Sequence, residues 1–128
     1  MEIYYNPDHT GYAVLVSHGF GAGWSSWNMK ELAYDKRVVE WYLDKVEGHP
    51  AYCMKLGFRD SKEAQEARAL FASWGYKDVY FGGVRLDMLT WVPVNKYWRI
   101  VEYDGNEAIE FQNIDDYIMF KGDKKDEV

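Results

Sequence analysis

The N-terminal segment alternates in the two-residue period of β-strands. A short strand is expected over Glu2–Tyr5, and turn residues follow it as far as Gly11. The next segment, Tyr12–Ser17, is apolar on both of its alternating faces apart from its last residue. Strands with two apolar faces are typical of the interior of a fold, so we expect this strand to be central in its sheet.

The first helix is predicted from Asp35, an N-cap residue, to Val46, with apolar residues recurring every three or four positions. Gly48 and Pro50 predict its end, because glycine favours the position after a helix and proline cannot continue one. Residues 29–34 form either a separate helical turn or an extension of this helix.

A second helix begins near Asp60, where Glu63 completes a capping box, and ends at Gly75. Its apolar stripe consists of Ala64, Ala67, Leu70, Phe71 and Trp74. This spacing predicts a helix that buries one face.

The C-terminal part returns to the period of strands. Strands are predicted over Val84–Val92, Tyr97–Tyr103 and Glu107–Gln112, and Asp104-Gly105 is a strong hairpin signal between the last two. Residues 121–128 read as a charged tail. The order ββααβββ therefore predicts one α+β domain over residues 1–128, with an antiparallel sheet of about five strands and two helices on one face.

Composition narrows the class of protein. The 128 residues are 48% hydrophobic, which excludes a disordered chain, and 18% are aromatic, which suits either a core or a binding surface. The single cysteine, Cys53, excludes an intramolecular disulfide. No signal peptide or membrane-spanning stretch is recognisable, so we expect a protein of the cytoplasm.

The formal net charge of −6 argues against direct binding to nucleic acid, which needs a basic face. From Ile100 to Phe120 there is no basic residue at all. The acidic residues of this stretch are Glu102, Asp104, Glu107, Glu110, Asp115 and Asp116. Such a surface suits a basic groove on a partner protein.

A glycine-rich loop follows the second predicted strand, with Gly19, Gly21 and Gly23 alternating after His18. Its backbone N–H groups and the side chains of Ser25 and Ser26 could bind the phosphate of a small nucleotide. Lys36 or Arg37 would then also contact this phosphate. The spacing matches neither of the familiar phosphate-binding glycine motifs. The alternative is a structural loop with positive φ angles into which Trp24 or Trp27 packs, and we expect one of these rings inside and one accessible.

Glu102, Asp104 and Glu107 flank the predicted hairpin turn. Paired carboxylates serve acid–base catalysis or hold a divalent ion, but a hairpin rim of this kind is more often only solvated. An enzyme would use His18 with Glu102 or Asp104. Catalysis is disfavoured because no nucleophile, metal or cofactor motif is present, and Pro50 should keep His49 and Cys53 apart.

Two segments, GFGAGWSSWN with LAYDKRVVE and LTWVP with RIVEYDGNE, resemble small uncharacterised proteins encoded by bacteriophages and prophages. The resemblance covers roughly half of the chain and implies a viral origin without an attached activity. Small acidic phage proteins of this kind often act by binding.

The leading hypothesis is a phage-derived, non-enzymatic protein that binds a host protein, such as a component of a defence system. A nucleotide-binding protein and an enzyme are the alternatives. We expect no cofactor, no bound metal, no membrane and no direct nucleic-acid partner, and either a monomer or a homodimer.

Overall fold

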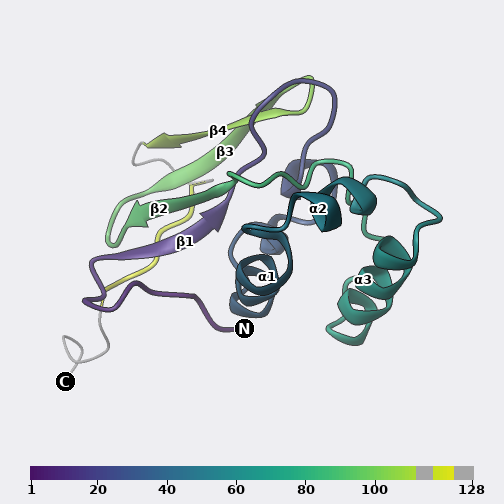
Figure 1. The fold of residues 1–128 in the computed structure, drawn as a ribbon. Coiled ribbons are helices and arrows are strands. Elements are labelled where there is room, and N and C mark those ends of the chain that lie inside the picture. Colours follow the sequence, from purple (N-terminus) through teal and green to yellow (C-terminus); the bar gives the residue numbers. More distant parts are fainter. Residues whose placement is uncertain (112–116, 123–128) are drawn as a thin grey trace.

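A computed structural model describes residues 1–111 and 117–122 of the chain. Its strands lie on one side and its helices on the other (Figure 1). The strands are β1 (Gly11–Leu15), β2 (Leu89–Pro93), β3 (Trp98–Tyr103) and β4 (Asn106–Phe111). The helices are α1 (Lys36–Trp41), α2 (Pro50–Leu56) and α3 (Lys62–Ser73), with 3₁₀ turns η1 (Ser25–Trp27) and η2 (Lys30–Ala33) and a π-helical turn η3 (Tyr42–Val46).

The α+β class is confirmed, but the single five-stranded sheet and the order ββααβββ are wrong. The strands of the described chain form two antiparallel pairs, β1 with β2 and β3 with β4. The predicted strand Glu2–Tyr5 supplies only isolated bridges, from Ile3 to Asp35 and from Tyr5 to Tyr12. The predicted strand from Val84 begins only at Leu89. Residues 84–88 form a loop in which Val84 and Met88 are buried and residues 85–87 are exposed.

Pro50 does not only end a helix, as predicted, but also begins another. It occupies the first turn of α2, where a backbone N–H has no helical partner and its absence is harmless. His49 is the N-cap of this helix, and its carbonyl accepts a hydrogen bond from the Cys53 N–H. The expectation that Pro50 keeps these two residues out of one helix is therefore wrong.

The cap of α1 is the predicted one, whereas the predicted cap of α3, with its capping box to Glu63, is wrong. The Asp35 carboxylate accepts a hydrogen bond from the Arg37 N–H at the start of α1, as predicted. For α3 the cap is Ser61 and not Asp60, since its hydroxyl accepts from the Ala64 N–H at 3.0 Å. Of the predicted stripe, Ala64, Ala67 and Phe71 are buried, whereas Leu70 is exposed.

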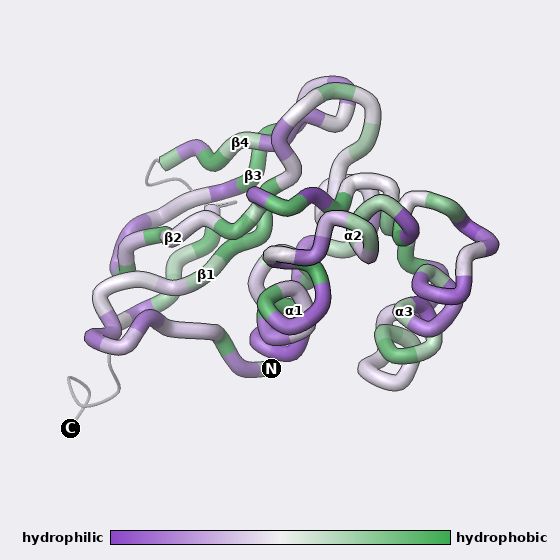
Figure 2. Tube along the Cα trace, viewed as in Figure 1, coloured by the Kyte–Doolittle hydropathy of each residue, from purple (hydrophilic) through white to green (hydrophobic). Residues whose placement is uncertain are grey.

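Strand β1 lies between two hydrophobic clusters. Ala13 and Leu15 face the larger cluster, which includes Trp41 and Phe71 from the helices. Tyr12 and Val14 face the smaller one, formed with residues that include Val92 and Trp98. All five residues of β1 are buried, as its two apolar faces predict. In the described chain β1 pairs with β2 in a two-stranded sheet, so the expectation that it is central in its sheet is wrong. Figure 2 shows hydrophobic segments along β1 and on the neighbouring α1.

Several sequence predictions fall outside the described residues: Gln112 at the end of the last strand, the carboxylates Asp115 and Asp116, and the tail from residue 123. Among the helices that are described, none has the length and apolar character to cross a membrane.

Candidate functional site

The glycine loop and the β3–β4 hairpin turn, more than 80 residues apart in sequence, lie against each other. Figure 1 shows the loop after β1 rising beside the hairpin. The Gly21 N–H donates to the Asp104 carbonyl at 2.6 Å, and the Gly19 N–H donates to the Asn106 side-chain oxygen at 2.9 Å. The two segments that were singled out in the sequence therefore form one structural unit.

Glu107 fastens this unit from within. One carboxylate oxygen accepts from the Ser17 N–H at 2.9 Å, and the other accepts from the Trp24 N–H at 2.9 Å and the Ser26 N–H at 3.0 Å. The Ser26 hydroxyl donates to the same second oxygen. We call these four donors of Ser17, Trp24 and Ser26 the carboxylate cradle. The expectation that Glu107 is a solvated rim residue is wrong, because only 1% of it is exposed.

Glycines allow the loop and the turn to approach this closely. Gly21 has a φ of +109°, a conformation that residues with a Cβ rarely adopt. Gly105 has a φ of +87°, and a Cβ on it would lie 2.4 Å from the Ala22 backbone nitrogen. The prediction of a loop that needs positive φ angles is confirmed.

The two tryptophans of the loop divide as expected. Trp24 is fully buried, and its indole N–H donates to the Leu32 carbonyl at 2.9 Å. Trp27 keeps 43% of its surface exposed and stacks on Tyr80 at a ring separation of 6.2 Å. Asn28 fixes Tyr80 by exchanging two hydrogen bonds of 2.9 Å with its backbone.

A second exposed aromatic pair lies on the same unit. Phe20 from the glycine loop meets Tyr103 from the end of β3 edge to face, with ring centres 6.1 Å apart. Their exposed fractions are 63% and 76%. We call Phe20, Trp27, Tyr80 and Tyr103 the aromatic tip.

Glu102 links the tip to the hairpin turn. One oxygen of its carboxylate accepts from the Gly105 N–H at 2.7 Å and from the Trp27 indole N–H at 3.1 Å. These two hydrogen bonds lower the pKa of Glu102 below its usual value. The side chain therefore presents a fixed negative charge beside the Trp27 ring.

The predicted cations lie elsewhere. Arg37 forms an ion pair of 2.8 Å with Asp35, whose carboxylate also accepts from the Tyr76 hydroxyl at 2.7 Å. Burial raises the pKa of Asp35, but the hydrogen bonds from Arg37 and Tyr76 outweigh it and hold that pKa below its usual value. Arg37 thus holds the start of α1 and does not face the glycine loop.

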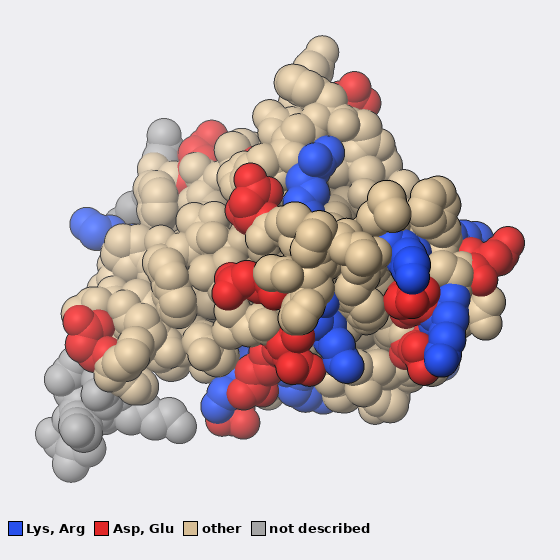
Figure 3. Space-filling view, in the orientation of Figure 1, with Lys and Arg blue, Asp and Glu red and all other residues tan. Residues whose placement is uncertain are grey.

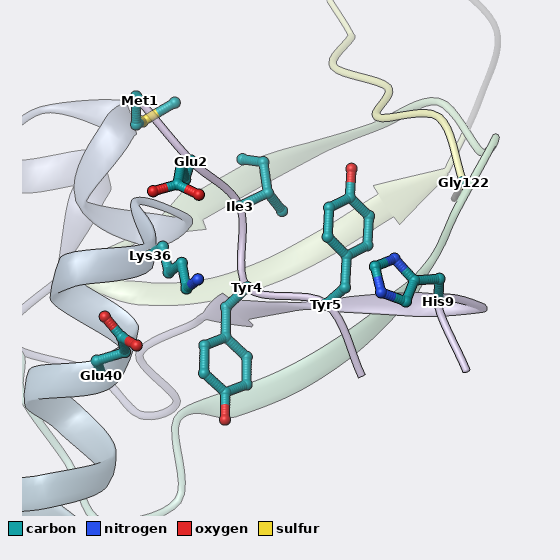
Figure 4. Close-up of a pocket in the computed structure, with 9 residues that line it drawn as sticks. All are labelled: Met1, Glu2, Ile3, Tyr4, Tyr5, His9, Lys36, Glu40 and Gly122. Carbon is teal, nitrogen blue, oxygen red and sulfur yellow. The ribbon is translucent and has the colours of Figure 1, made fainter. Parts of the chain in front are cut away.

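Lys36 lines a groove of about 680 Å³ between the N-terminal segment and α1. Figure 4 shows it between Glu2 and Glu40, with Tyr4, Tyr5 and His9 along the rest of the groove. Tyr5 and His9 stack with ring centres 4.9 Å apart. Because the Glu2 and Glu40 carboxylates flank the Lys36 ammonium group, this part of the lining does not favour a phosphate.

The residues of the enzyme alternative do not assemble. His18 is exposed, and no hydrogen bond or ion pair joins it to Glu102 or Asp104 among the described residues. Cys53 is partly buried, which raises the pKa of its thiol and opposes nucleophilic chemistry. In the part of the chain that the structure covers, no cluster of three or more His, Cys, Asp or Glu side chains is arranged to hold a metal ion.

Sequence reasoning missed five residues of the unit: Phe20, Asn28, Tyr80, Tyr103 and Asn106. Asn106 binds the Gly19 N–H. A large aromatic residue between two loop glycines was a signal for Phe20, since its neighbours leave it little to pack on. Tyr80 had no local signal, because its stacking on Trp27 joins segments 53 residues apart.

No protein-family model, curated protein or solved structure matches the chain.

Proposed function

We propose that this chain is a non-enzymatic binding protein that attaches to a host protein through the aromatic tip. The observation that carries the proposal is the support beneath the exposed rings. Phe20 and Trp27 flank a loop whose backbone is fixed by the buried Glu107 carboxylate. Rings that are already held in place lose little conformational freedom on binding, and aromatic residues contribute strongly to protein interfaces.

The nucleotide alternative has less support. A phosphate at the glycine loop would need the backbone N–H groups of the carboxylate cradle, and the chain's own Glu107 already occupies them. A second anion beside a buried carboxylate would also be repelled. The enzyme alternative lacks the contact between His18 and a carboxylate that it requires.

The host as the source of the partner rests on the resemblance to phage and prophage proteins. A phage protein that binds without catalysis acts by occupying a host protein, and a defence component is the kind of target that such binding would block. The chain's net charge of −6 suits a partner with a basic surface.

Capture from the lysate of a bacterial host, followed by mass spectrometry of proteins and small molecules, tests the proposal. Three tagged proteins are compared: the wild type, the tip variant Phe20→Ala/Tyr103→Ala, and the control Met54→Ala/Phe58→Ala. The control removes side chains that are 62% and 61% exposed, much like the 63% of Phe20. It therefore removes a comparable exposed apolar surface from α2 and the residues after it.

We expect one host protein at near-equal amount with the wild type and the control, and its loss with the tip variant. Urea unfolding of all three proteins verifies that the variants remain folded. Equal capture by the tip variant would contradict the proposal, as would a retained nucleotide without a protein.

A further inference from the structure

The hydrogen bonds of Glu102 indicate which kind of chemical group the aromatic tip can bind. Its carboxylate is held by Gly105 and Trp27 through a single oxygen, Oε2. Among the described residues no group donates to the other oxygen, Oε1, and no Lys or Arg forms an ion pair with Glu102. The residue is exposed to solvent. One acceptor of a fixed, ionised carboxylate thus remains available to a partner.

Aromatic rings lie beside this acceptor. Trp27, which donates its indole N–H to Glu102, stacks on Tyr80 with an angle of 22° between the ring planes. About half of Tyr80 and of Trp27 is exposed, at 46% and 43%. A cation over such rings is attracted by their π electrons, and the same cation can pair with the carboxylate.

We propose that the tip binds an arginine side chain of the partner protein, with its guanidinium against the Trp27–Tyr80 stack and hydrogen-bonded to Glu102. A guanidinium is planar, stacks on aromatic rings and donates to carboxylates in a fixed geometry, whereas an ammonium group is compact and strongly hydrated. This inference rests on the proposed function and names the chemistry that the partner must carry.

The charge around the tip is consistent with this ligand. The hairpin turn adds Asp104, and the strands β3 and β4 contain a single basic residue, Arg99, which pairs with Glu110. The guanidinium of Arg85 lies against Gly19 in the glycine loop. On the face that Figure 3 shows, Lys and Arg gather mainly over the helices.

A titration with short peptides tests the inference without knowledge of the partner. The probes are acetyl-Gly-Arg-Gly-amide and the same peptide with citrulline, which keeps the shape of arginine but has no charge. The readout is the ¹H–¹⁵N NMR signal of the Trp27 indole N–H, assigned with Trp27→Phe. Probe concentrations extend to about 20 mM, the range of weak binding expected for one ion pair with ring stacking.

We expect the arginine peptide to shift this signal with an affinity at least about fivefold higher than the citrulline peptide, a difference of about 1 kcal/mol. Glu102→Gln should reduce the difference to the part that the rings contribute, and added salt should reduce it in the wild type. The matched control Glu110→Gln, on β4 of the same hairpin, should retain it. Equal shifts with both peptides, no shift, or full binding by Glu102→Gln would overturn the inference.

The two tests fail separately. A host protein that requires the tip, together with an indifferent response to arginine, would overturn the inference and leave the proposed function standing. Arginine binding without any tip-dependent host protein would do the reverse.

Discussion

Removal of the Glu107 carboxylate is expected to release the glycine loop from the hairpin and to destabilise the whole fold. The perturbations are Glu107→Gln, which keeps the shape of the side chain, and Glu107→Ala, which removes it. The carboxylate accepts hydrogen bonds from three backbone N–H groups and one hydroxyl, and only 1% of Glu107 is exposed.

The size of the destabilisation depends on which hydrogen-bond donors of the carboxylate cradle are left without any acceptor. Ser26 is exposed, so in the variants its N–H and hydroxyl can donate to water instead of Glu107. Ser17 and Trp24 are buried, so their N–H groups would lack an acceptor. Each buried N–H left without an acceptor costs about 1–3 kcal/mol. With the loss of packing, we expect Glu107→Ala to lower the free energy of unfolding by about 3–5 kcal/mol. Glu107→Gln should lower it by about 2–3 kcal/mol, because its amide NH₂ is itself a donor and cannot replace the second oxygen.

Urea unfolding followed by circular dichroism measures both values, and amide hydrogen exchange at Ser17 and Trp24 reports the loop directly. The control is Glu110→Gln, which loses a partly exposed ion pair with Arg99 but keeps an amide oxygen that can accept from the Tyr117 hydroxyl, so it should cost less than about 1 kcal/mol. Formate added to Glu107→Ala should restore part of the lost stability, compared with chloride at equal ionic strength. A change below about 1 kcal/mol in Glu107→Gln would refute the view that the cradle holds the loop.

Three further predictions concern the turn, the core and the pH dependence of stability. Gly105→Ala should lower the free energy of unfolding by about 2–4 kcal/mol, because the strain of a positive φ adds to the clash of the new Cβ with Ala22. The control Gly48→Ala also has a positive φ but open space around it, and it should lower the free energy of unfolding by only about 1–2 kcal/mol. Equal values for the two variants in urea unfolding would contradict the close contact at Gly105. Phe71→Ala should lower the free energy of unfolding by about 3–5 kcal/mol, because this fully buried ring contacts four others, those of Trp24, Trp41, Trp74 and Phe81. A loss below about 2 kcal/mol in the same assay would show that the core collapses around the gap. The pKa of Asp35 is lower in the folded protein than in the unfolded chain. Its ionised form therefore stabilises the fold at every pH above the ordinary carboxyl pKa of about 3.9. This stabilisation is lost as the pH falls through the pKa of Asp35 in the folded protein. Asp35→Asn should therefore be less stable than the wild type at pH 7 and lose less stability on acidification, and parallel pH profiles of urea unfolding would contradict this.

Short-range features of the sequence determined much of the local structure. The Asp35 cap, the stop at Gly75, the turn at Asp104-Gly105 and the buried strand around Val14 all depend on neighbouring residues. Their physics is complete within a few positions: a side chain caps the next turn, glycine accepts positive φ, and alternation defines two faces. The α+β class followed from these elements.

Only the tertiary structure decided how the strands pair and what the loop and hairpin do together. The arrangement of two strand pairs depends on contacts between β1 and β2, which lie more than 70 residues apart. Local alternation places a residue on a face but does not choose the partner strand.

The candidate site shows the same division. The sequence by itself identified the glycine loop, the hairpin carboxylates, and one buried and one accessible tryptophan. It did not distinguish Glu102 from Glu107, two glutamates paired across the same hairpin. One lies exposed beside Trp27 and the other fills a cradle of N–H groups. Those donors come from a segment more than 80 residues away, and a buried charge is tolerable only where such donors converge, so folding alone separates the two.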